Sequence, residues 1–196
     1  MQDAGDRSQQ DAGDRSQQDA GDRSQSSAGE RCNPAKAAED RLEHALGLAL
    51  RQLNRRDRTV SEIEHHLAAQ QVEAGAAGRA VKRLCEQGYL DDARFARLFI
   101  ADKRELEEWG NERIRRTLRK RGIDRELIDG ELAAGPEDGE LARALMLLRR
   151  RFPSPPRDRR EREQALGMMV RKGFDNELAL DALSSYRSEE EEPSLS

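Results

Sequence analysis

The sequence predicts an all-α protein in which three tandem three-helix repeats stack into an elongated, curved body behind a disordered N-terminal tail. Two observations favour helices. Only 35% of the 196 residues are apolar, with one Trp, two Tyr and four Phe, so narrow helical stripes are easier to bury than the faces of a sheet sandwich. The Leu and Ala residues recur at spacings of three and four, as they do on one face of a helix.

Residues 1–40 form the predicted tail. An eight-residue unit, DAGDRSQQ, begins at Asp3 and Asp11 and returns at Asp19 with one change at its end. The unit has no large apolar residue, so burial cannot offset the entropy lost on ordering and we expect disorder. A second, acidic tail is expected over residues 188–196, which carry four glutamates and no basic residue.

The three repeats are expected at residues 41–88, 89–134 and 135–187. A shift of 51 residues superimposes Gly122 on Gly173 and Asp124 on Asp175, and a fixed period of this length is typical of repeat proteins. The Gly-Pro pair at 135–136 marks the last boundary. Each repeat alone is too small for comfortable stability, so neighbours should stack and share apolar faces, and curvature would give the body a concave surface.

A short motif is predicted to join the first two repeats. Gly88 suits the left-handed end of one helix, and Asp91 suits the N-cap of the next, where Asp92 adds negative charge. Leu90 and Phe95 hold the two positions of a hydrophobic staple. A catalytic carboxylate pair is the alternative, but it lacks a general base or metal partner. The structural motif comprises Gly88, Tyr89, Leu90, Asp91, Asp92 and Phe95.

No catalytic or metal-binding pattern is found in the sequence. His65 and His66 are adjacent, so on a helix they point about 100° apart and cannot clamp one metal ion. The glycines at 75 and 78 lack the Lys-Ser/Thr of a phosphate-binding loop. We therefore expect a protein that is not an enzyme and needs no cofactor.

The cellular location is inferred from the cysteines and from the apolar runs. Cys32 and Cys85 lie in unlike segments, which favours reduced thiols over a disulfide. No run approaches the roughly 20 apolar residues of a membrane span, and the N-terminus lacks the apolar core of a signal peptide. We expect a cytoplasmic protein with no membrane association.

Positive charge recurs in register with the repeats. Residues 41–187 hold 30 basic against 26 acidic side chains, so the acidity of the chain lies in its tails. For any single Arg, a solvated position paired with Glu one turn away is the simpler interpretation. The clusters together favour a phosphate-rich or carboxylate-rich partner, because the guanidinium fork pairs with both groups. The predicted partner- or DNA-binding residues are Arg55, Arg56, Arg58, Arg115, Arg116, Arg119, Lys120, Arg149, Arg150, Arg151, Arg159 and Arg160.

The run GYLDDARFA from Gly88, followed by Trp109-Gly110, Arg113-Ile114 and Gly122-Ile123, resembles the central motif of the bacterial RecX family over about residues 42–186. Asn111 departs from the pattern, because the family often has Pro there, which preorganises the first helical turn. The resemblance implies an all-helical, non-enzymatic regulator that binds along the groove of the RecA–DNA filament and represses its ATPase and strand-exchange activities. It also implies a role in DNA repair, recombination and the SOS response, as a monomer with weak, non-specific contacts to DNA.

Two other functions remain open from the sequence. One is a helix-turn-helix transcriptional regulator that reads DNA with the segment NERIRRTLRKRG. Three similar basic units and few Asn or Gln base readers argue against it. The other is a helical scaffold whose charges only keep it soluble.

Overall fold

The computed structural model describes residues 33–134 and 139–191. Over these ranges it contains nine α-helices and no strand, which confirms the all-α class. The octapeptide units, the Gly-Pro pair at 135–136 and residues 192–196 lie outside the described residues. Helices reach into both predicted tails, because the first begins at Pro34 and the last ends at Glu191.

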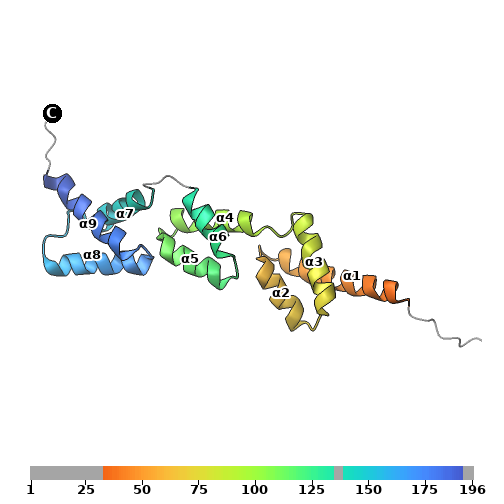
Figure 1. Ribbon diagram of the computed structural model, residues 1–196. Coiled ribbons are helices and arrows are strands. Elements are labelled where there is room, and N and C mark those ends of the chain that lie inside the picture. Colours follow the sequence, from red (N-terminus) through yellow and green to blue (C-terminus); the bar gives the residue numbers. More distant parts are fainter. Residues whose placement is uncertain (1–32, 135–138, 192–196) are drawn as a thin grey trace, which may run out of the picture. The chain divides into compact units, whose positions relative to one another are not determined.

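The helices form three consecutive groups that can be followed by their labels in Figure 1. In group 1, helices α1, α2 and α3 pack on one another; group 2 is built in the same way from α4, α5 and α6; in group 3, α9 packs against both α7 and α8. The bounds are α1 (Pro34–Leu53), α2 (Val60–Ala69), α3 (Ala74–Glu86), α4 (Asp92–Glu105), α5 (Asn111–Lys120), α6 (Arg125–Ala133), α7 (Gly139–Arg151), α8 (Arg159–Lys172) and α9 (Asn176–Glu191).

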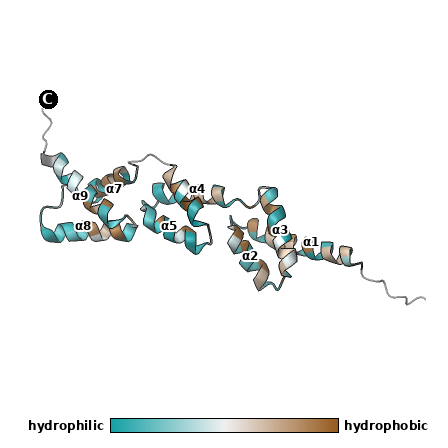
Figure 2. Ribbon diagram, in the orientation of Figure 1, coloured by the Kyte–Doolittle hydropathy of each residue, from teal (hydrophilic) through white to brown (hydrophobic). Residues whose placement is uncertain are grey.

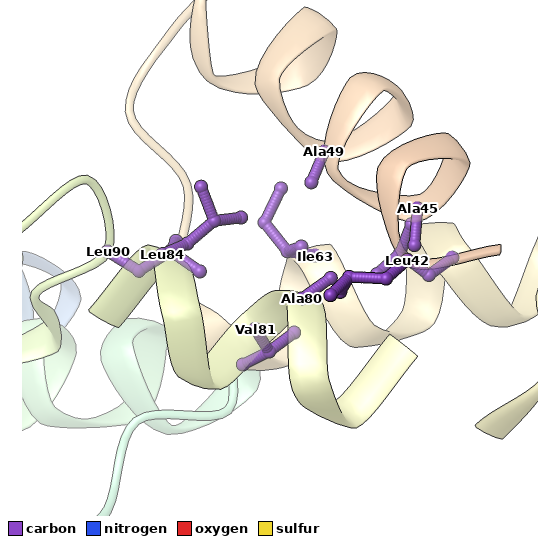
Figure 3. Packing of buried hydrophobic residues seen from close by; sticks show 9 residues of the cluster. Leu42, Ala45, Ala49, Ile63, Ala80, Val81, Leu84 and Leu90 are labelled. Carbon is purple, nitrogen blue, oxygen red and sulfur yellow. The ribbon is translucent and has the colours of Figure 1, made fainter. Parts of the chain in front are cut away.

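Each group encloses its own cluster of buried apolar side chains. Helices carry both hydrophobic and hydrophilic residues in Figure 2, as expected of amphipathic segments that bury one stripe. In group 1 the side chains of Ala49, Ile63 and Leu84 come from three different helices and point toward one another (Figure 3). The fully buried side chains of the other two clusters include Ile114, Leu118 and Ile128 in group 2 and Leu147, Leu148 and Met169 in group 3.

The motif at Gly88 ends one group and starts the next. Gly88 has a left-handed backbone (φ +73°), and the Asp91 carboxylate accepts from the amide of Arg94 at 2.9 Å as the N-cap of α4. The two positions of the predicted staple face different cores. Leu90 is buried in the cluster of group 1, whereas Phe95 packs against the cluster of group 2. The motif therefore links the cores of groups 1 and 2 through the turn between α3 and α4.

The ends of the three middle helices, α2, α5 and α8, repeat one another at the predicted offset of 51 residues. After each helix, an amide donates back to a carbonyl five residues earlier: Val72 to Leu67 at 3.1 Å, Ile123 to Leu118 at 3.2 Å and Phe174 to Met169 at 3.1 Å. These are Schellman endings, in which the residue before the donor is left-handed. Those residues are Gln71, Gly122 and Gly173, with φ of 59°, 81° and 93°.

The middle helices meet end to end. At the first seam, defined here as the contact of the α2 start with the α5 end, Thr59 Oγ1 donates to the carbonyl of Arg121 at 2.7 Å. At the second seam, between the α5 start and the α8 end, the amide of Gly110 donates to the carbonyl of Lys172 and the amide of Glu112 to that of Gly173, both at 3.0 Å. At the second seam, amides at a helix start thus meet carbonyls at a helix end that lack partners within their own helices. At the first seam, a side-chain hydroxyl is the donor to such a carbonyl.

The seams leave no room for a Cβ atom at Gly122, which follows α5, or at Gly173, which follows α8. A Cβ added at Gly122 would lie 2.3 Å from Ser61 Cβ, and one added at Gly173 would lie 2.1 Å from Arg113 Cβ. A glycine is thus required at both positions by the close approach as well as by the backbone.

We predict that Gly122→Ala destabilises the protein more than Gly88→Ala does. Both glycines are left-handed, so each substitution should cost about 1–2 kcal/mol of backbone strain. The new Cβ at 88 meets no atom within 4 Å, whereas the one at 122 collides with Ser61, which should add about 1–3 kcal/mol. Urea unfolding followed by circular dichroism measures both, and equal losses for the two variants would show that the first seam tolerates a side chain.

Candidate functional site

Helix α5 carries three of the predicted binding residues with exposed side chains. Ile114 and Leu118 are fully buried, and Arg116, Arg119 and Lys120 are exposed on other sides of the helix. Their spacing of three and four residues brings the three cations together on neighbouring turns. In the part of the chain that the structure describes, no carboxylate pairs with any of them. They are therefore available to an external anion.

Arg115 is engaged within its own group, unlike its three neighbours. Its Nε donates to Asp129 at 2.9 Å, and Nη1 contacts Glu112. The Arg115 guanidinium and its hydrogen bond hold the pKa of the Asp129 carboxyl below its usual value. Arg115, one of the predicted partner-binding residues, thus ties α5 to α6 within the described fold.

The other predicted cations divide in the same way. Arg58 lies near Glu62 and Gln52, Arg149 pairs with Glu189, Arg150 with Glu108, and Arg159 with Glu163. Arg55, Arg56, Arg151 and Arg160 are exposed and have no ion pair among the described residues. Together with the three cations of α5 they make seven unpaired members of the predicted set, and we call these seven the open cations.

The first seam is reinforced by an ion pair that the sequence analysis did not single out. Arg121 donates from Nε and Nη2 to the two carboxylate oxygens of Glu62, at 2.8 and 3.1 Å, while its guanidinium carbon lies 4.3 Å from the centre of the Phe95 ring. Burial works to raise the pKa of Glu62, but the hydrogen bond and charge of Arg121 outweigh it, so the pKa lies below the usual value. The pair joins residues of groups 1 and 2.

Asp92, the first residue of α4, lies beside the first seam, and its pKa is shifted in the direction opposite to that of Glu62. Its carboxylate accepts from the amide of Val60 at 2.9 Å, so the acid predicted to complement the dipole of α4 also serves the first turn of α2. Burial and the nearby carboxylates of Asp91 and Glu62 raise the pKa of Asp92, although the bond from Val60 opposes them. Asp92 thus links the start of α4 to the start of α2.

Asn111 is the centre of a polar cluster at the second seam. Its amide donates to Glu140 Oε1 at 2.7 Å, and its side-chain amide also contacts Glu140. Its side-chain oxygen accepts from Arg104 at 3.0 Å and from Arg143 at 3.3 Å. Burial lowers the pKa of both arginines. A proline at this position would lack the amide hydrogen, so the departure noted in the sequence supplies a link between α4, α5 and α7.

Two exposed apolar side chains stand beside the motif. Tyr89 is 57% exposed and Leu98 58%, and they line a shallow depression together with Arg94 and Asp91. The sequence assigns Tyr89 to the structural motif. Its exposure has one signal in the sequence: neighbouring residues point to different sides of the chain, so the residue before a buried Leu90 is expected to face solvent.

Within residues 33–134 and 139–191, no three His, Cys, Asp or Glu side chains come together in a way that could hold a metal ion. Nor does any helix there combine the length and apolar character needed to cross a bilayer. The thiol of Cys85 is free and exposed. The described surface is defined by open cations and by the two seams.

These features define the class: a tandem array of three-helix domains joined through the ends of their middle helices. Comparison with known proteins gives the family. The models for the first and second three-helix domains of RecX match residues 45–84 and 91–132. A "Regulatory protein RecX" from Trichlorobacter lovleyi is 37% identical over 66% of this chain and 87% of its own length, and one from Mycolicibacterium vanbaalenii is 34% identical over 82% and 92%.

The chain belongs to the RecX family of regulatory proteins. Among solved structures, RecX from Lactobacillus salivarius aligns with a TM-score of 0.67 at 18% identity, over 76% of this chain and 97% of that one. A second RecX crystal structure aligns with a TM-score of 0.65 at 23% identity, over 77% of each chain. Identity this low shows the shared fold alone.

We predict that Arg121→Gln lowers the free energy of unfolding by about 2 kcal/mol near pH 7, the usual value of a hydrogen bond to a charged group. Because the pKa of Glu62 is lowered in the folded protein, its stabilisation is present above its unfolded pKa and is lost as the pH falls through the folded value. The difference between variant and wild type should therefore close below about pH 4. Denaturant unfolding at several pH values measures it.

Arg97→Gln is the matched control for that experiment. Arg97 also forms a two-bond pair with a carboxylate, that of Glu131, but its side chain is 66% exposed, so its loss should change stability little. If both variants lost the same free energy of unfolding, the Arg121–Glu62 pair would contribute no more to stability than an exposed ion pair does.

We also predict that Asn111→Ala destabilises the protein by about 1–3 kcal/mol, because Arg104 and Arg143 lose an acceptor in a half-buried site. Asn176→Ala, at an exposed asparagine in the first turn of α9, should change stability far less. Thermal unfolding of both variants provides the measurement. An Asn111→Ala protein as stable as wild type would mean that water replaces the side chain without loss.

Proposed function

We propose that this protein is a non-enzymatic regulator that binds the RecA–DNA filament and lowers its ATP hydrolysis and strand exchange. Family membership supports a regulatory role. The observation that carries the partner assignment is the set of open cations on α5, Arg116, Arg119 and Lys120, which have no carboxylate partner among the described residues. A nucleoprotein filament presents phosphates and protein carboxylates, and both suit Arg and Lys.

The repeated groups add a reason for a filament as the partner. Open cations occur in all three groups, at Arg55 and Arg56, on α5, and at Arg151 and Arg160. When several linked sites engage one polymer, each later contact is intramolecular, so weak single contacts add up to tight overall binding. Binding to free DNA through the same side chains would be weak and without sequence preference, because backbone contacts carry no sequence information. We expect a cytoplasmic monomer that acts in DNA repair and recombination.

The helix-turn-helix alternative is less well supported. In that mode the N-terminal residues of the recognition helix reach the base edges in the major groove. The N-terminus of α5, the helix proposed for this role, is covered at the second seam, where its amides bond to the carbonyls of Lys172 and Gly173. Gly110 is buried there. DNA entering at this end would have to break the seam.

We predict that replacing Arg116, Arg119 and Lys120 together by Gln weakens the inhibition of RecA-dependent ATP hydrolysis on single-stranded DNA by about tenfold. Each lost cation should also flatten the dependence of filament binding on salt. The three side chains have no partner in the described fold, so the melting temperature should stay close to that of wild type.

A matched triple replaces Arg79, Lys82 and Arg83 of α3 by Gln. These are also three exposed cations on one helix, so the variant has the same net charge, and it should inhibit like wild type. Equal activity of both triples would remove the special role of α5. Undiminished ATP hydrolysis with folded wild-type protein in excess would remove the proposed function.

A further inference from the structure

A groove of about 440 Å³ lies between α8 and α9 of group 3, apart from both seams. After the turn at Gly173, α9 runs back along α8 (Figure 1). Each helix contributes residues at positions i, i+3, i+4 and i+7, so each wall is a single helical face. The walls are Arg159, Arg162, Glu163 and Leu166 on α8 and Leu180, Leu183, Ser184 and Arg187 on α9, with Pro156 closing one end.

The groove has an apolar end and a cationic end. Leu166 of α8 faces the leucines at 180 and 183 of α9, whereas Arg159 lies at the N-terminal end of α8, toward the C-terminal part of α9 that carries Arg187. Arg159 and Leu166 are seven residues apart, which is about 10 Å along a helix. The two ends are therefore separated by about two helical turns.

The apolar end is left open to solvent in this chain. Leu180 is 47% exposed, although it stands beside the half-buried leucines at 166 and 183. Covering an exposed leucine that is flanked by others in a concave site removes apolar surface from water and so stabilises a complex with the partner. The lining as a whole has three arginines against one glutamate. That glutamate pairs with Arg159, but the two side chains are 92% and 62% exposed and such a surface pair is weak, so electrostatics still favour a partner with negative charge.

We propose that this groove receives an amphipathic helical segment of a protein partner. Such a segment would place Leu, Met or Phe against Leu180 and carboxylates about two turns away, against Arg159 and Arg162. A nucleic-acid backbone would satisfy the arginines but would leave the leucines uncovered, so an acidic amphipathic peptide fits the groove better. The inference rests on the proposed function in one respect: the protein subunits of the filament are the partner expected to supply the segment.

The test uses the full chain and a fluorescein-labelled helical peptide with leucines on one turn and glutamates about two turns further. Fluorescence anisotropy should show saturable binding. Leu180→Glu should weaken it about tenfold or more, because an apolar anchor is replaced by a charge that repels the peptide. Leu106→Glu, at a leucine that is 78% exposed and is not part of the groove lining, is the matched control and should bind like wild type. A peptide with lysines in place of the glutamates should bind more weakly.

The groove assignment is overturned if Leu180→Glu binds the acidic peptide as well as Leu106→Glu does, or if the lysine peptide binds equally well. It is also overturned if the wild type sediments as a dimer that Leu180→Glu dissociates, because a second copy would then fill the groove. Competition with RecA filaments on single-stranded DNA separates the two proposals. Peptide binding that depends on Leu180, by a protein that does not bind filaments, refutes the proposed function and leaves the groove assignment standing.

Discussion

The arrangement of the groups depends on one contact, the meeting of helix ends at the two seams. A helix start has amides without partners and a helix end has carbonyls without partners. At the second seam the amide of Gly110 donates to the carbonyl of Lys172, and at the first seam the hydroxyl of Thr59 donates to the carbonyl of Arg121. The approach is close enough that Gly122 and Gly173 cannot carry a side chain. Polar contacts of backbone and side chains hold one group to the next, and each group keeps its own apolar core.

The seams also decide which charges remain for a partner. Glu62 pairs with Arg121, and Glu108 pairs with Arg150 and Lys172. Glu140 accepts a hydrogen bond from Asn111. These three glutamates are thus engaged where groups meet, and Arg116, Arg119 and Lys120 of α5 have no carboxylate partner among the described residues. A chain with more acidic than basic residues overall can in this way present local positive charge.

The helical class, the offset of 51 residues and the capping role of Asp91 could be predicted from sequence, because each depends on local spacing or on a single residue type. The division of the arginines could not. Arg115 and Arg116 are adjacent and chemically identical, yet only Arg115 reaches Asp129, since that contact depends on where α6 packs. Asn111 looked like a missing proline, and its use as a hub depends on Glu140 and Arg143 of another group. Division of the chain into repeats at the stated boundaries remains our interpretation.

Gln71 follows α2 at the position that a glycine holds after α5 and α8. It stands at the position of Gly122 and Gly173 and has the same left-handed backbone, but it carries a full side chain where those glycines carry a hydrogen atom. No preceding middle helix abuts it among the described residues, so this chain tolerates there what it excludes at both seams. A middle helix brought to this end as closely as α2 is brought to Gly122 would meet that side chain. The residue at this one position thus differs between a helix end that is docked at a seam and one that no middle helix contacts among the described residues.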